Sequence, residues 1–199
     1  MNKSKQISAT FLRDLANLPT AYFALIMATG IVSIASYNLN FILIANLLFY
    51  FNIAAYLFMS LLYILRAALY PKRIWADTLD HAKSPGLLTY VAGTCVLGTQ
   101  FVIIAGNFLI ASILLYIGSA AWLILIYTVF TVFTVKANKP PINEAISGVW
   151  LLIIVSTQSV SILANQLTGY LPFDNDIVSF FALAMFLCGC MFYIIIITL

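Results

Sequence analysis

The residues of this sequence whose spacing could serve chemistry are small and neutral polar side chains. Thr29, Ser33, Ser36 and Asn40 follow one another at steps of four, three and four residues. Such steps place side chains on one face of an α-helix. Hydroxyl and amide groups on one face can bind a polar solute or an anion without using a charge.

Two further stripes of this kind occur later in the chain. They comprise Gly86, Gly93 and Gln100 at seven-residue steps, and Ser147, Gln158, Ser161 and Asn165. Three such stripes are compatible with a neutral, water-filled path through a membrane. The same residue types also join helices in membrane proteins, and the spacing leaves both roles open.

Ionisable side chains are missing from the apolar segments that carry these stripes. Every charged residue, and the single histidine His81, lies between the apolar segments or at their ends. Membrane enzymes and proton-coupled transporters need such groups within the membrane. Asp77 and His81 would share a helix face but have no further metal ligand beside them, and Cys188 and Cys190 lie in an apolar stretch. We therefore expect no enzymatic activity, no cofactor and no metal site.

The elements that must position the stripes are membrane-spanning helices. The 199 residues are 64% hydrophobic and 8% charged, with a mean hydropathy of +1.08. Soluble domains have roughly 25% charged residues, so this composition excludes a soluble, disordered or nucleic-acid-binding protein. A hydrocarbon core of about 30 Å requires about 20 apolar residues, which predicts a single all-α, multi-pass transmembrane bundle over residues 1–199. The predicted spans are 21–37, 41–65, 87–105, 108–135, 145–164 and 177–199.

The cations predict the orientation of this bundle. All nine Lys and Arg residues precede the first span, separate the second from the third, or separate the fourth from the fifth. The positive-inside rule therefore places the N-terminus in the cytoplasm, and six spans return the C-terminus there. The first apolar stretch is longer than that of a signal peptide, so we expect it to be the first helix.

The connections predict three helical hairpins. Pro19, Pro85 and Pro141 stand shortly before the first, third and fifth spans, and proline is well tolerated at a helix start. Short connections make consecutive helices antiparallel neighbours. The polar stripes belong chiefly to the odd spans, so we expect odd helices inside and even helices outside, against lipid.

Three segments of the chain resemble one family of transporters. Residues Phe23–Ala35 are similar to the first-helix signature of the tellurite-resistance/dicarboxylate transporter family, which includes fungal malate permeases and plant slow anion channels. His81–Gln100 and Ser147–Val160 fit the same family. The resemblance implies a largely uncharged pore, ringed by odd helices, for malate and other C4-dicarboxylates, tellurite or inorganic anions. It also implies a homotrimer, and we expect the protein in the cell membrane, that is, a plasma or inner membrane. The pore-facing candidates that it implies are Thr29, Gly30, Ser33, Gly93, Gly98, Gln100, Gln158 and Ser161.

The family's members have ten helices in five hairpins, whereas six spans are predicted here. The family's gating phenylalanine, in the ninth helix, has no counterpart in this sequence. Residues Ile194–Leu199 end the chain without a basic tail, so we expect it to be incomplete at the C-terminus and to correspond to the first six helices. The alternative to an anion conduit is a truncated, non-transporting membrane protein or scaffold whose polar stripes only pack helices.

Overall fold

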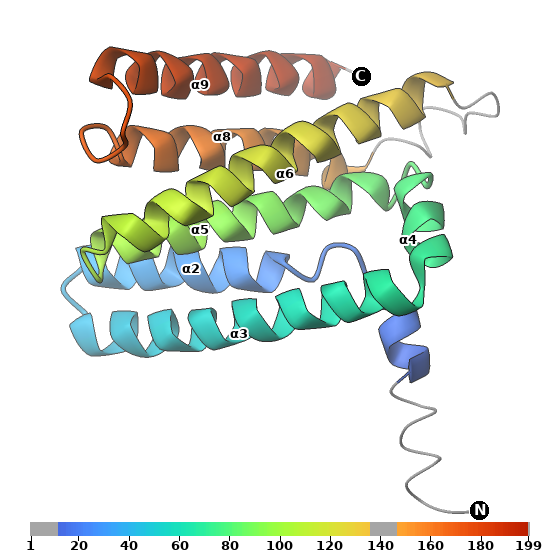
Figure 1. The fold of residues 1–199 in the computed structure, drawn as a ribbon, viewed down its shortest axis with the longest axis horizontal. Coiled ribbons are helices and arrows are strands. Elements are labelled where there is room, and N and C mark those ends of the chain that lie inside the picture. The colour runs from blue at the N-terminus through green and yellow to red at the C-terminus, as the bar shows by residue number, and fades with distance from the viewer. Residues whose placement is uncertain (1–11, 136–146, 199) are drawn as a thin grey trace, which may run out of the picture.

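A computed structural model describes residues 12–135 and 147–198, and every regular element in these two ranges is helical (Figure 1). Residues 12–16 are helical. The helices that follow in chain order are α2 (Ala24–Asn38), α3 (Ile42–Leu69), α4 (Pro71–Thr78), the 3-10 helix η1 (Ser84–Leu88), α5 (Thr89–Ile103), α6 (Phe108–Val135), the 3-10 helix η2 (Gly148–Trp150), α8 (Leu151–Gln166) and α9 (Asn175–Thr198). The prediction of an all-α membrane bundle is confirmed.

Within the described ranges, five segments are long and apolar enough to cross a membrane. They are Ile42–Leu69, Ser84–Ile103, Phe108–Val135, Gly148–Gln166 and Asn175–Thr198. The first helix, α2, is apolar but has only 15 residues. At about 1.5 Å per residue it is roughly 22 Å long, which is less than the thickness of a hydrocarbon core.

The short length of α2 has a local cause. The expected span begins at Ala21, but the chain between Pro19 and Ala24 makes turns instead of helix. The Tyr22 N–H donates to the Pro19 carbonyl at 3.4 Å and the Ala24 N–H to the Ala21 carbonyl at 2.9 Å. These i to i+3 bonds satisfy the backbone where the helical ladder has not yet begun.

Each hairpin turns through a residue with a left-handed backbone. Asn40 has φ 63° between α2 and α3, Gly106 has φ 61° between α5 and α6, and Gly169 has φ 87° between α8 and α9. Glycine and asparagine adopt this conformation at low cost and terminate helices in this way. The turns reverse the chain, so the two helices of each hairpin are antiparallel neighbours.

The inner and outer layers differ in burial. Helix α5 packs against α2, α6 and α8, and the outer helices α3, α6 and α9 each pack along the preceding helix of their own hairpin (Figure 1). In the most apolar stretch of Ser84–Ile103, 67% of the residues are buried, against 17% in Asn175–Thr198. The expected arrangement, with odd helices inside and even helices outside, is therefore present and is clearest for α5.

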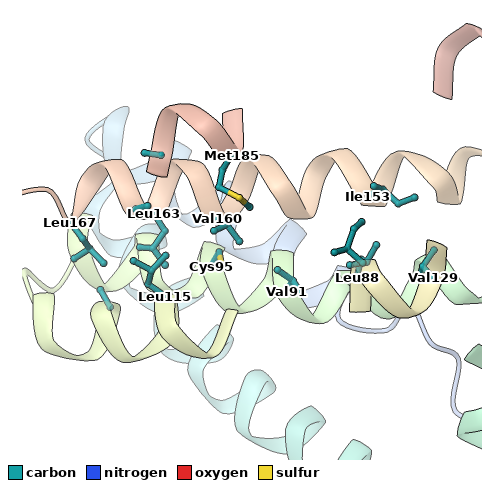
Figure 2. Packing of buried hydrophobic residues seen from close by; sticks show 14 residues of the cluster. Leu88, Val91, Cys95, Leu115, Val129, Ile153, Val160, Leu163, Leu167 and Met185 are labelled. Carbon is teal, nitrogen blue, oxygen red and sulfur yellow. The ribbon is translucent and has the colours of Figure 1, made fainter. Parts of the chain in front are cut away.

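The main apolar core lies between α5, α6, α8 and α9 (Figure 2). Cys95 of α5, Val160 and Leu163 of α8, and Met185 of α9 meet there. A Cβ on Gly118 of α6 would lie 2.7 Å from the Cys95 Sγ, so glycine is needed for this close approach. Because lipid tails are as apolar as these side chains, tight packing stabilises the contact more than removal from water does.

The described cations lie at one end of the bundle, hereafter the basic end, where α4 is located (Figure 1). They are Arg13, Arg66, Lys72, Arg73 and Lys83. The described residues near the start of α9, at the opposite end, include Asp174 and Asp176 but no cation. The expectations for Lys3, Lys5, Lys136, Lys139 and Pro141 lie outside the described residues.

Candidate functional site

The eight predicted pathway residues lie on three adjacent inner helices. Helix α2 carries Thr29, Gly30 and Ser33, α5 carries Gly93, Gly98 and Gln100, and α8 carries Gln158 and Ser161. The structure brings Gly30 and Gln100 together, whereas three of the others contact the outer helix of their own hairpin.

Gln100 belongs to a buried cluster that consists of two side-chain amides, those of Asn52 and Gln100, and the neighbouring Gly30. This group is hereafter called the amide cluster. Asn52 of α3 and Gln100 of α5 are both fully buried, and the Asn52 Nδ2 donates to the Gln100 Oε1 at 2.6 Å. Gly30 of α2 covers this bond, since a Cβ there would lie 3.1 Å from the Asn52 Nδ2 and 3.2 Å from the Gln100 Oε1. The cluster therefore joins three helices around one hydrogen bond.

The amide cluster retains unused hydrogen-bonding capacity. The Gln100 Nε2 and the Asn52 Oδ1 find no hydrogen-bond partner among the residues that the structure describes. An unpaired buried polar group costs about 1–3 kcal/mol, so each atom favours a water or solute partner. The Gln100 N–H is a donor suited to an anion.

Sequence reasoning missed Asn52 as a site residue. It lies in the predicted span 41–65, which is largely apolar. The signal was nevertheless present, because an amide within an apolar span is costly unless it has a partner. The identity of the partner could not be read from the sequence, since Gln100 follows 48 residues later.

A second polar contact continues along the same pair of helices toward the basic end. The Tyr56 hydroxyl of α3 and the Thr94 Oγ1 of α5 are 3.1 Å apart. Beyond them, the Phe23 ring stacks edge-on against Tyr63 and Tyr90, with centroids 5.1 and 5.0 Å away. Along the α3–α5 interface, from the interior to the basic end, the contacts are therefore made first by amide side chains, then by hydroxyl groups and then by aromatic rings.

Three predicted pathway residues bind the backbone of outer helices. The Ser33 Oγ donates to the Ala45 carbonyl of α3 at 2.8 Å, and the Ser161 Oγ donates to the Ala182 carbonyl of α9 at 2.6 Å.

The Gln158 Nε2 likewise donates to the Phe186 carbonyl of α9 at 3.1 Å. Its amide lies against Gly189, where a Cβ would be only 2.5 Å from that nitrogen. For Ser33, Gln158 and Ser161 the observed contacts are those that hold hairpins together.

Two of the remaining predicted residues, Gly93 and Gly98, set the spacing of the inner helices. A Cβ on Gly98 would lie 2.6 Å from the Leu163 Cδ2 of α8, and one on Gly93 would lie 3.3 Å from the Phe23 carbonyl oxygen. Glycine therefore permits α5 to approach both neighbours closely. Thr29 lies half-buried on α2.

Comparisons with known proteins give one family. Residues 17–199 match the family model described as voltage-dependent anion channel. The chain is also 27% identical over 164 residues to an uncharacterized transporter of Methanocaldococcus jannaschii, with 78% of this chain and 47% of the archaeal protein covered. The chain thus spans about half the length of the curated relative it matches. No solved structure matches the chain significantly.

Proposed function

The chain belongs to the voltage-dependent anion channel family, and we propose that it forms part of a conduit for small anions across a cell membrane. The observation that carries this proposal is the family match over residues 17–199, a range that includes every helix from α2 to α9. The chain spans about half of its archaeal relative, so the anion transport named by the family is proposed here for this chain.

The neutral interior of the bundle supports anion passage without tight binding. At the basic end, one long helix of the described structure carries a charged side chain. This residue is Arg66, and it lies in the last turn of α3. Deeper positions carry hydroxyls and amides, which bind an anion weakly enough to release it. Of the eight proposed pathway residues, Gln100 has the best support, because its Nε2 is buried without a protein partner in the described structure.

The proposed substrates are C4-dicarboxylates such as malate, tellurite, or inorganic anions, as the family resemblance implies. We place the basic end and the N-terminus in the cytoplasm, following the positive-inside rule. Three hairpins do not enclose a five-hairpin pore, so further helices or copies of the chain would complete it. A homotrimer is the proposed assembly.

Anion flux into liposomes tests the proposal. Vesicles containing the purified chain are expected to take up chloride or malate above protein-free vesicles. Gln100→Leu is expected to reduce that flux about tenfold, the effect of removing one charge-assisted hydrogen bond. Asn46→Leu is the matched control, because Asn46 is an amide of α3 outside the amide cluster. Absence of flux for the unaltered chain, in vesicles where a ten-helix member of the family conducts, would overturn the proposal in favour of a non-transporting protein.

A non-transporting membrane protein is the competing function, and specific contacts favour it. Ser33, Gln158 and Ser161 bind carbonyls of outer helices, as in a bundle whose polar residues only pack helices. Gln158→Leu separates the roles at this position. Loss of flux at unchanged expression would assign Gln158 to the pathway, and unchanged flux would leave it as a packing contact.

A further inference from the structure

A cavity at the basic end is lined by more positive than negative charge. Its volume is about 540 Å³, within the roughly 300–1,000 Å³ of small-molecule sites. Residues 16–21, the end of α3, helix α4 and the segment before η1 form its wall. Three cationic side chains line the cavity, those of Arg66, Arg73 and Lys83. The carboxylate in the lining is that of Asp77. Asp80 does not line the cavity but pairs with Lys83, so three cations stand against two carboxylates and the surroundings of the cavity carry a net positive charge.

Arg66 lines this cavity, and one of its donors is unfilled. Its side chain is only 3% exposed, and its Nη2 donates to Asp77 and to the Ala16 carbonyl. Its Nε has no hydrogen-bond partner within the described ranges. A buried charged group with an unsatisfied N–H is costly, so a bound acceptor at this position would stabilise the structure.

Of the other two cations, Arg73 is the one without a carboxylate partner among the described residues. The Arg73 Nη1 donates to the Asn17 Oδ1 at 2.5 Å, and that amide carries no charge. The Lys83 Nζ lies 3.2 Å from the Asp77 Oδ1, but the same carboxylate already pairs with Arg66. Asp80 is 3.7 Å from Lys83 and does not line the cavity. Arg73 therefore retains a guanidinium without an anionic partner in the described structure.

We propose that this cavity binds an oxyanion, a carboxylate or phosphate group, between Arg66, Arg73 and Lys83. A guanidinium donates parallel hydrogen bonds that match the oxygens of both groups. This inference deepens the proposed function. It rests on that function in one respect, namely that the anion bound in the cavity is the anion that then enters the conduit. The phosphate of an anionic lipid has the same chemistry and is the other source of this ligand.

Calorimetric titration in an uncharged detergent tests the site with malate and with inorganic phosphate. Arg73→Gln and Lys83→Gln are each expected to weaken binding about tenfold. Lys72→Gln is the matched control, because Lys72 neighbours Arg73 on α4 and is exposed but does not line the cavity. Equal affinities in all three variants and the unaltered chain would overturn the inference.

A second arm identifies the source of the oxyanion. The chain is placed in bilayer discs of phosphatidylcholine, with or without phosphatidylglycerol, and the lipid retained after extraction is measured by native mass spectrometry. Phosphatidylglycerol that is retained by the unaltered chain and lost in Arg73→Gln supports the site with a lipid as its ligand. Binding of neither free anion, together with lipid retention independent of Arg73, shows a cavity filled by water and overturns the inference.

These experiments distinguish a failure of the oxyanion site from a failure of the proposed function. Anion flux with no binding that depends on Arg73 would overturn this inference alone. Binding that depends on Arg73 without any flux would overturn the conduit and leave the oxyanion site standing.

Discussion

Helix α3 carries two buried polar side chains, and each is paired with a residue of another helix in a different way. Asn52 pairs with Gln100 in the interior, and Arg66 pairs with Asp77 at the basic end. The two α3 residues are 14 positions apart, so they share roughly one helix face and are separated by about 21 Å along it. Both are buried, and each pair contains a nitrogen without a described partner.

The difference lies in charge and depth. A charged side chain in the hydrocarbon core is costly, so the ion pair lies at the end of α3 and the neutral pair lies deeper. A neutral amide attracts an anion through a dipole, whereas a guanidinium attracts it through a full charge. The comparison supports a proposed division of roles, with an anion collected at the basic end and passed along a neutral interior.

Breaking the charged cluster should have the largest effect on stability. Asp77→Asn leaves Arg66 buried without its carboxylate and is expected to lower the free energy of unfolding by about 3 kcal/mol. Titration with sodium dodecyl sulfate in mixed micelles measures this change. Asp80→Asn is the control, because Asp80 and Lys83 form a solvent-exposed pair, and it should cost less than about 0.5 kcal/mol. Equal losses in the two variants would contradict the prediction.

Crowding the amide cluster should have the next largest effect. Gly30→Ala places a Cβ against Val96, Asn52 and Gln100 and is expected to destabilise the bundle by about 2 kcal/mol. Gly148→Ala is the control, because a Cβ there meets none of the described residues within 4 Å. The same micelle titration applies, and a Gly30→Ala variant as stable as the unaltered chain would show that the three helices are more loosely packed than described.

Removing one amide should cost less than crowding the cluster. Asn52→Leu leaves the Gln100 side chain unpaired in the interior and is expected to cost about 1 kcal/mol. Adding Gln100→Leu removes the remaining amide, so the double variant should recover part of that loss. A double-mutant cycle measures the coupling between the two residues. Additive losses would indicate that the 2.6 Å hydrogen bond contributes nothing to stability.

The smallest effects should come from the serine contacts within hairpins. Ser33→Ala and Ser161→Ala each remove one hydroxyl bound to a carbonyl of the outer helix. The expected cost is about 0.6 kcal/mol for each, the average for hydrogen bonds between membrane helices. Ser36→Ala serves as the control, because the Ser36 Oγ bonds to the Val32 carbonyl of its own helix. A Ser161→Ala loss as large as that of Asp77→Asn would contradict this ranking.

Particular residues show how far the sequence could predict the site. Gln158 and Ser161 were correctly placed on one inner helix, but their spacing gave no sign that both bind α9. Helix α4 was not expected, although Pro71 at its first position is a helix-start signal. Asp77 was considered only together with His81 as a possible metal ligand, and its pairing with Arg66 emerges only when α4 folds back on α3.

The sequence by itself determined the membrane environment, the helical class, the family and the clustering of described cations at one end. These properties follow from segment length, apolarity and the position of charges, which are local along the chain. Tertiary structure decided which polar groups meet, because partners such as Asn52 and Gln100 lie on different helices 48 residues apart. Packing fixes the rotation and spacing of those helices. It therefore decides which polar side chains are used up in hydrogen bonds and which, like the Gln100 Nε2, remain open.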